Sequence, residues 1–237
     1  RGVTSQSMIN YKLHMIILWI CVVIGVIVFS AMFVSIVLHR KSKGHEAAKF
    51  THSTKAEIIW TIIPVVILVV MAVPATKALV NMEVAPETEM TVKITGFQWR
   101  WKYEYVEDGV SFISSLDPDS NAARRLESGQ DPASIDNYLL EVDKPLVLPA
   151  ETKIKFLITA DDVIHSWWVP ALGWKRDAVP GFVNEAWTEI MEPGVYRGQC
   201  AELCGKDHGF MPIVLNVLPR DEYDAWVKQQ QRQVAAQ

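Results

Sequence analysis

Two long apolar segments near the start of the chain constrain its fold more than any other feature. The first, Leu13–Leu38, contains no Asp, Glu, Lys or Arg over its 26 residues. A helix of that length reaches about 39 Å, whereas the hydrocarbon core of a bilayer is about 30 Å thick. The second, Ile58–Leu79, contains Pro64 and Pro74, and membrane helices tolerate proline better than water-soluble ones. A buried core helix is an alternative for the second segment, but residues 1–80 are predicted to form a transmembrane hairpin with spans of about 13–38 and 58–79.

The charges between these segments predict how the chain is oriented. Basic residues in this loop outnumber the single acid Glu46: Arg40, Lys41, Lys43, Lys49 and Lys55. Because basic loops stay on the cytoplasmic side, we expect the N-terminus and everything after about Asn81 on the outer side. The predicted location is a bacterial inner (cytoplasmic) membrane with the second domain in the periplasm.

Residues 81–237 form a predicted exported domain of a different composition. They hold 15 Lys and Arg against 25 Asp and Glu, which is a net charge of −10. Such a domain is unsuited to nucleic acid and can steer a basic protein partner toward itself, although acidity can also serve solubility alone.

The exported domain is predicted to be all-β. Short apolar stretches bounded by Pro and Gly are typical of a sandwich or a barrel. The predicted strands are Thr91–Thr95, Phe97–Tyr105, Tyr138–Val142, Leu146–Leu148, Lys153–Thr159, Ala186–Met191, Val195–Gln199 and Ile213–Leu218. Ser114–Asn137 is predicted to be a surface loop with a short helix around Ala122–Ser128, and a closing helix is predicted after Pro219.

A soft set of metal ligands is concentrated in the run CAELCGKDHGFM. Cys200, Cys204, His208 and Met211 lie in this run, and His165 stands upstream in ADDVIHSWW. Glycines in and around the run favour a loop between two strands over a helix, with His165 arriving from a neighbouring loop. Thiolate, imidazole and thioether select copper, and two bridging thiolates with one His each would hold a pair of copper ions. Zinc is the main alternative because two Cys and two His form a tetrahedral zinc site; a single blue-copper ion would need only one thiolate.

The chain resembles subunit II of haem-copper cytochrome c oxidases over nearly its whole length. The resemblance rests on the hairpin and on the runs GFQWRWKYEY, DDVIHSWWVPALGWKRDAVPG and PGVYRGQCAELCGKDHGFMPIVLNV. It implies a cupredoxin-like Greek-key barrel that holds a dinuclear copper centre, CuA. The implied roles are bridging ligands for Cys200 and Cys204, terminal ligands for His165 and His208, a weak ligand for Met211, and a main-chain carbonyl ligand for Glu202. The Glu202 side chain would join a magnesium or manganese site shared with subunit I; as an alternative, it is a solvated loop carboxylate.

The same resemblance assigns electron entry from cytochrome c to Trp99. Trp99 and Trp101 are expected on one strand, where both would face the same side, and core packing is the alternative for either. Asp161 and Asp162 match acidic docking positions, with Glu107 and Asp108 as looser candidates for docking a basic partner. Two departures from the family pattern, Phe97 and Arg100, imply a different docking mode or a less basic donor.

Glu57, at the start of the second span, matches a family glutamate at the entrance of a proton channel into subunit I. The alternative role for Glu57 is that of a carboxylate that the helix dipole stabilises at the N-terminus of the helix.

The predicted function of the chain is therefore the electron-entry subunit of a cytochrome c oxidase. Haem, the oxygen-reducing copper and coupled proton pumping belong to partner oxidase subunits, chiefly subunit I. A tethered copper chaperone, a structural subunit of a quinol oxidase and a nitrous oxide reductase are the alternatives.

Overall fold

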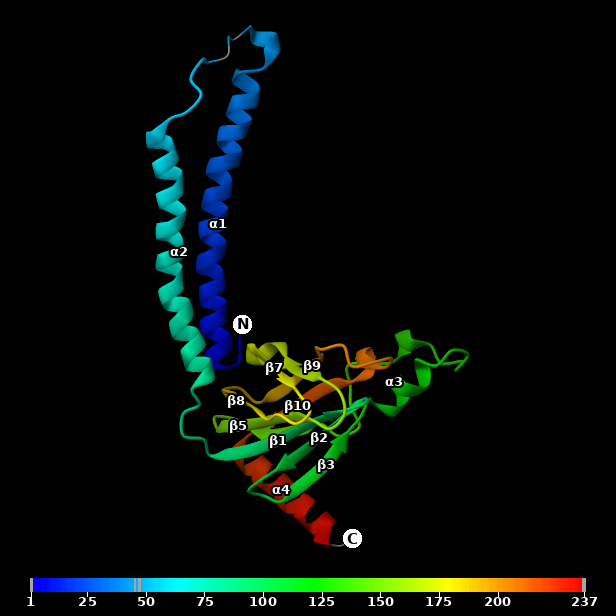
Figure 1. Ribbon diagram of the computed structural model, residues 1–237. Coiled ribbons are helices and arrows are strands. Elements are labelled where there is room, and N and C mark those ends of the chain that lie inside the picture. Colours follow the sequence, from blue (N-terminus) through cyan, green and yellow to red (C-terminus); the bar gives the residue numbers. More distant parts are fainter. Residues whose placement is uncertain (1, 45, 47, 236–237) are drawn as a thin grey trace. The chain divides into compact units, whose positions relative to one another are not determined.

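The computed structural model describes residues 2–44, 46 and 48–235. The described chain divides into two compact units, of which one is Ile9–Val80 and the other contains the residues on either side of it (Figure 1). The first unit consists of the helices α1 (Ser5–Leu38) and α2 (Thr54–Glu83), apart from their outer ends, with the short 3-10 turn η1 (Lys41–Lys43) between them. Both helices are long and apolar enough to cross a membrane.

Helix α1 begins earlier than the predicted span because its first turn is capped by side chains. The Ser7 N–H donates to Thr4 Oγ1 and the Thr4 N–H donates to Ser7 Oγ, each over 3.0 Å. This reciprocal pair satisfies two amides that a helix N-terminus otherwise leaves free. Thr4 Oγ1 also donates to the Leu172 carbonyl over 2.8 Å, so the cap belongs to the β-domain.

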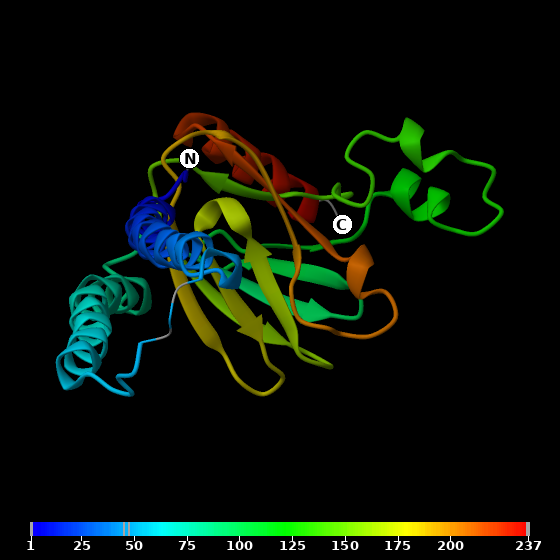
Figure 2. The same cartoon turned by 90° about the horizontal axis from the view of Figure 1, so that it is seen from above.

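The β-domain consists of two five-stranded sheets (Figures 1 and 2). The first, in spatial order, contains β3 (Val110–Ser114), β2 (Arg100–Tyr105), β1 (Met90–Phe97), β5 (Lys153–Ala160) and β8 (Asn184–Glu189). The second contains β4 (Leu146–Pro149), β10 (Pro212–Leu218), β9 (Gly194–Cys200), β6 (His165–Val169) and β7 (Trp174–Ala178). Each sheet has one parallel pair, β1 with β5 and β10 with β4, and its other pairs are antiparallel.

The core lies between the two sheets. Strand β5 alternates strictly between half-buried and buried residues, as a strand with one face on the core must. Trp167 stacks with Phe156 and Trp174 at centroid distances of 5.6 and 5.3 Å. The Tyr105 hydroxyl donates to the Val147 carbonyl over 2.8 Å and accepts the Val147 N–H over 3.0 Å, which joins β2 of one sheet to β4 of the other.

Several predicted elements differ from the observed ones. The predicted strand Phe97–Tyr105 is broken by a turn at Gln98 and Trp99. Trp99 and Trp101 therefore do not share a strand face. Trp101 lies on β2 and is fully buried, which confirms the packing alternative for that residue.

The predicted strand Tyr138–Val142 is absent from the described chain, because Asn137 and Leu139 have φ values of 53° and 62°, which are incompatible with an extended strand. Strands β3, β6 and β7 were not predicted. Helix α3 (Pro118–Ala123) lies upstream of the predicted Ala122–Ser128, because Asp117 caps it by accepting the Ser120 N–H over 3.0 Å.

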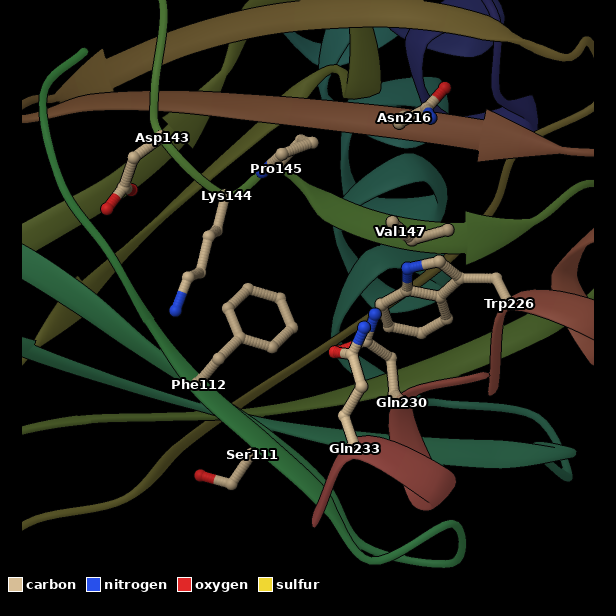
Figure 3. Close-up of a pocket in the computed structure, with 10 residues that line it drawn as sticks. All are labelled: Ser111, Phe112, Asp143, Lys144, Pro145, Val147, Asn216, Trp226, Gln230 and Gln233. Carbon is tan, nitrogen blue, oxygen red and sulfur yellow. The ribbon is translucent and has the colours of Figure 1, made fainter. Parts of the chain in front are cut away.

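The closing helix α4 (Arg220–Ala235) covers the space beside the edge strands β3 and β4. Its Trp226 packs against Tyr105 at 5.3 Å between ring centroids. A groove of about 490 Å³ remains there, between the Phe112 and Trp226 rings and the Lys144 side chain (Figure 3). None of the residues that line this groove is a predicted metal ligand.

Candidate metal centre

The loop between β9 and β10 carries the predicted ligands in sequence order. Cys200 is the last residue of β9, and Met211 immediately precedes β10. His208 begins the short 3-10 turn η4 (His208–Phe210). The Cys200 N–H donates to the Met211 carbonyl over 3.1 Å, which closes the loop at its base. The predicted arrangement, a loop between two strands that wraps around its ligands, is therefore observed.

His165 reaches this loop as the first residue of β6 and not from a loop. Strand β6 pairs with β9, with Trp167 opposite Cys200. The Ala201 N–H donates to the Ser166 carbonyl over 2.9 Å and extends this pairing. Strand pairing thus brings His165 to the cysteines, although 35 residues separate it from Cys200.

Each thiol lies beside one imidazole. Cys200 Sγ is 3.9 Å from His165 Nδ1, and Cys204 Sγ is 3.5 Å from His208 Nδ1. The two sulfur atoms are 3.9 Å apart and both cysteines are free, a separation far longer than the roughly 2.05 Å of a disulfide. The ligand atoms of His165, Cys200 and Cys204 all lie within 4.8 Å of one another.

These donors fit a pair of soft metal ions. His165, Cys200, Cys204 and Met211 are buried, with 0, 6, 3 and 2% of their surface exposed. The Glu202 carbonyl oxygen lies 3.4 Å from Cys200 Sγ, so the loop also offers a main-chain oxygen. Two thiols, each with its own imidazole, a buried thioether and a carbonyl match the ligand preferences of copper. The Glu202 side chain is exposed.

Asp162 orients the His165 ring. Its Oδ1 lies 2.9 Å from His165 Nε2, and its carboxylate accepts the N–H groups of Gln98 and Val163 over 2.8 and 2.6 Å. A proton on Nε2 satisfies the carboxylate and leaves the Nδ1 lone pair facing Cys200, as metal-binding histidines require. Sequence reasoning placed Asp162 on the docking surface and missed this contact; a carboxylate three residues before a ligand histidine was the available signal.

The turn between β1 and β2 contacts the ligand loop directly. Gln98 Nε2 and Trp99 Nε1 both donate to the Cys204 carbonyl, over 2.9 and 3.2 Å. Trp99 is half-buried, and Lys206 Nζ lies 5.5 Å from its ring centroid. Sequence reasoning singled out Trp99 but missed Gln98.

Phe97 and Arg100, the two residues expected to depart from the family pattern, contact each other. The Arg100 guanidinium lies 5.3 Å from the centroid of the Phe97 ring, a cation–π contact. Arg100 is exposed. Its charge is therefore held on the surface close to Trp99.

The other predicted acids occupy different settings. Asp161 is exposed beside the site, where its main-chain N–H bonds Gly96. Glu107 accepts the Thr91 N–H and Asp108 accepts the Tyr223 hydroxyl, each over 2.8 Å, at the turn between β2 and β3. Glu57 lies in the first turn of α2.

The site perturbs the pKa values of both thiols. Burial opposes ionisation of Cys200, but contacts with His165 and with the main chain at Glu202 and Ser166 outweigh it and lower its pKa to about 7. Burial and the neighbouring Cys200 charge raise the pKa of Cys204. One thiol of the pair therefore ionises near neutral pH, whereas the second requires a metal ion to displace its proton.

This asymmetry predicts a pH profile for the metal-free protein. Because only the thiolate is nucleophilic, alkylation of Cys200 in the full chain by iodoacetamide should lose half its rate as the pH falls through about 7. Cys204 should react slowly over the same range. Mass spectrometry of quenched samples separates the two sites, and denaturant should return both midpoints to the ordinary value of about 8.5. A native Cys200 midpoint near that ordinary value would contradict the assignment.

The fold and site together define a β-sandwich domain with a soft-metal site in one loop, linked to two apolar helices. Comparisons with known proteins agree with this class. The families described as "Cytochrome C oxidase subunit II, periplasmic domain" and "Cytochrome C oxidase subunit II, transmembrane domain" match residues 90–218 and 3–78.

Individual relatives carry the same description. A probable cytochrome c oxidase subunit 2 from Rickettsia prowazekii is 44% identical over 219 residues, covering 92% of this chain and 66% of the relative. Cytochrome c oxidase subunit 2 from Cereibacter sphaeroides is 37% identical over 239 residues, covering 95% and 78%. The chain thus spans slightly less than two thirds of the Rickettsia protein's length.

A solved structure is similar to the β-domain. The periplasmic domain of subunit II of cytochrome oxidase (CoxB) of Bradyrhizobium japonicum is 37% identical, with a TM-score of 0.55. The match covers 63% of this chain and 99% of that domain.

The chain belongs to the family of cytochrome c oxidase subunit II. The predicted fold class is confirmed: two apolar helices precede a cupredoxin-like β-domain and a C-terminal helix. The family match and the two helices place the chain in a membrane.

Proposed function

We propose that this chain is the electron-entry subunit of a cytochrome c oxidase. It accepts electrons from cytochrome c at a dinuclear copper centre and passes them to haem in subunit I, where oxygen is reduced and protons are pumped. The paired arrangement of thiols and imidazoles carries this proposal, because each sulfur lies within 3.9 Å of a different histidine. The remaining oxidase subunits and the location in a bacterial inner membrane, with the β-domain in the periplasm, belong to the same proposal.

The distances among these side chains support the proposed ligand roles. Cys200 and Cys204 would be bridging ligands to two copper ions, and His165 and His208 would hold one ion each. Met211 would be a weak ligand to one copper and the Glu202 carbonyl a ligand to the other. Two bridged copper ions would share a single electron, which spreads the change in charge and limits ligand movement.

The protein supplies a dry, rigid setting for this pair. Burial of His165, both cysteines and Met211 limits the access of water, and the Asp162 carboxylate holds the His165 ring at one orientation. Trp99 connects the outside of the domain to the ligand loop through its 3.2 Å hydrogen bond to the Cys204 carbonyl. These contacts support Trp99 as the point of electron entry.

Replacing Trp99 with phenylalanine should lower the turnover number of the assembled oxidase by about 10-fold while leaving KM for cytochrome c nearly unchanged. The substitution removes the indole N–H bond to Cys204 but retains an aromatic ring. The matched control is Trp168→Phe, because Trp168 is a 40% exposed tryptophan on β6. Equal losses in turnover and binding, or none, would reject the electron-entry role.

Docking of cytochrome c is proposed at the acids near Trp99. Asp161 is free to meet a partner's lysines, whereas the Asp162 carboxylate has three internal partners. Glu107 and Asp108 remain looser candidates.

The positive charge of Arg100 opposes a strongly basic donor. The rate of electron transfer from cytochrome c should therefore depend less steeply on salt in the wild-type protein than in Arg100→Gln. An unchanged salt dependence would remove Arg100 from the docking face.

Two further roles depend on partner subunits. Glu202 is proposed to share a magnesium or manganese ion with subunit I through its exposed side chain, and Glu202→Gln should then lower manganese occupancy of the complex. Glu57 is proposed to stand at the entrance of a proton channel, and Glu57→Ala should then slow turnover. Unchanged occupancy or turnover would leave the solvated carboxylate or the helix-dipole carboxylate as the explanation.

A copper chaperone is the second candidate, but its ligands would need to be exposed and labile. The burial of both thiols instead favours a permanent site.

The deciding experiment is copper loading of the full chain in detergent followed by electron paramagnetic resonance. A hyperfine pattern from one electron shared equally by two copper nuclei is the expected result. A mononuclear copper pattern, or a preference for zinc in competition, would overturn the proposal.

A further inference from the structure

We propose that Arg124 is a positioning residue for the part of the ligand loop that carries His208 and Met211, an inference that rests on the proposed copper site. Arg124 is the C-cap residue of α3. Helix α3 belongs to the segment between β3 and β4, which extends away from the sandwich (Figures 1 and 2). The Nη1 and Nη2 atoms of Arg124 lie 3.2 and 3.4 Å from the two carboxylate oxygens of Asp207. Its guanidinium carbon lies 4.2 Å from the centroid of the Phe210 ring.

These two contacts flank the ligands in the sequence. Asp207 immediately precedes His208, and Phe210 immediately precedes Met211. The planar guanidinium therefore contacts both ends of the η4 turn. Its edge makes paired hydrogen bonds to Asp207, and its face packs against the Phe210 ring. Asp207 makes no side-chain cap to the turn, so its carboxylate is available for Arg124.

Arg124 is itself held in place from behind. Its Nε donates to Asn121 Oδ1 over 2.8 Å, and its main-chain N–H donates to the Ser120 carbonyl over 3.1 Å. Helix α3 is in turn fixed by its Asp117 cap, and the Asp117 N–H donates to the Glu141 carbonyl over 3.1 Å. The segment thus presents a preorganised guanidinium to the ligand loop.

We expect the Arg124 contacts to affect the retention of metal more than the stability of the fold. They act on the ligand loop and contribute little to global stability. The Arg124 and Asp207 side chains are 23 and 22% exposed, and such partly exposed ion pairs contribute little to global stability. Groups that orient metal ligands without touching the metal typically change affinity by about 10- to 100-fold when they are removed. Lysine would retain the charge but not the planar fork that serves the carboxylate and the ring together.

The test is the rate of copper transfer from the loaded full chain, in detergent, to a chelator. Arg124→Gln should accelerate transfer by about 10- to 100-fold and broaden the copper hyperfine pattern, and Asp207→Asn should do the same. Arg124→Lys should give an intermediate rate. The double variant should be no faster than either single variant, because both remove one shared interaction.

The matched control is Arg125→Gln, which makes the same change in charge at the neighbouring exposed position. It should leave the transfer rate and spectrum unchanged, and the thermal unfolding of both metal-free Gln variants should be alike. Equal transfer rates for the two Gln variants, or additive effects in the double variant, would overturn the role of Arg124. Failure of the wild-type chain to give the shared-electron spectrum would instead reject the proposed copper site.

Discussion

Replacing Cys200 with serine is expected to abolish the shared-electron copper spectrum and to lower the activity of the assembled oxidase by more than about 100-fold, the upper end of the range for groups that merely orient ligands. Cys200 lies between the second thiol and His165, at 3.9 Å from each. A hydroxyl is a poor copper ligand and does not bridge as a thiolate does. Copper content and paramagnetic resonance of the full chain, followed by oxygen consumption of the complex, measure the loss.

Cys21→Ser is the matched control for this substitution. Cys21 is the remaining cysteine and lies on α1, outside the metal site. It should leave copper content, spectrum and oxygen consumption unchanged. If the Cys200→Ser protein retained two copper ions with one shared electron, the bridging role would be wrong.

The second large effect is expected at Asp162. Asp162→Asn should weaken copper retention by about 10- to 100-fold, because the amide no longer supplies the anionic partner that holds the His165 Nε2 proton. The Asp162 carboxylate also accepts two main-chain N–H groups, from Gln98 and Val163. Its loss should therefore loosen the turn that carries Trp99 as well as the histidine.

The measurement is copper transfer from the full chain to a chelator, with Asp161→Asn as the control. The two aspartates are adjacent and both are exposed, but only Asp162 contacts His165. Asp161→Asn should affect the salt dependence of electron transfer and leave copper retention alone. Equal copper retention in the two variants would show that both residues serve docking only.

Patterns that depend on neighbouring residues could be predicted well from the sequence. The apolar segments follow from bilayer-length stretches with no charged residue in Leu13–Leu38 and only Lys77, near the end, in Ile58–Leu79. Four of the five predicted side-chain ligands lie in one short run, so a soft-metal site could be predicted from the composition of that run. The strands that could not be predicted were those whose burial is decided by distant segments. Strand β6, for example, combines a candidate ligand, a buried serine and a half-exposed tryptophan.

Trp99 and Trp101 show the same limit within one run. Their spacing predicted a shared strand face, but a turn places Trp99 against the ligand loop and Trp101 in the core. Local propensity could not distinguish these positions, because the contacts that decide between them come from Cys204, more than 100 residues away.

The sequence by itself determined the apolar segments and the residue types suited to a soft metal, because these depend on side-chain chemistry. Only the tertiary structure decided which groups hold the candidate ligands in place. Asp162 became the partner of His165, the Gln98–Trp99 turn became a support for Cys204, and Arg124 reached Asp207 from 83 residues away. The physical reason is that orientation depends on strand pairing and loop packing between distant segments, which no local pattern encodes.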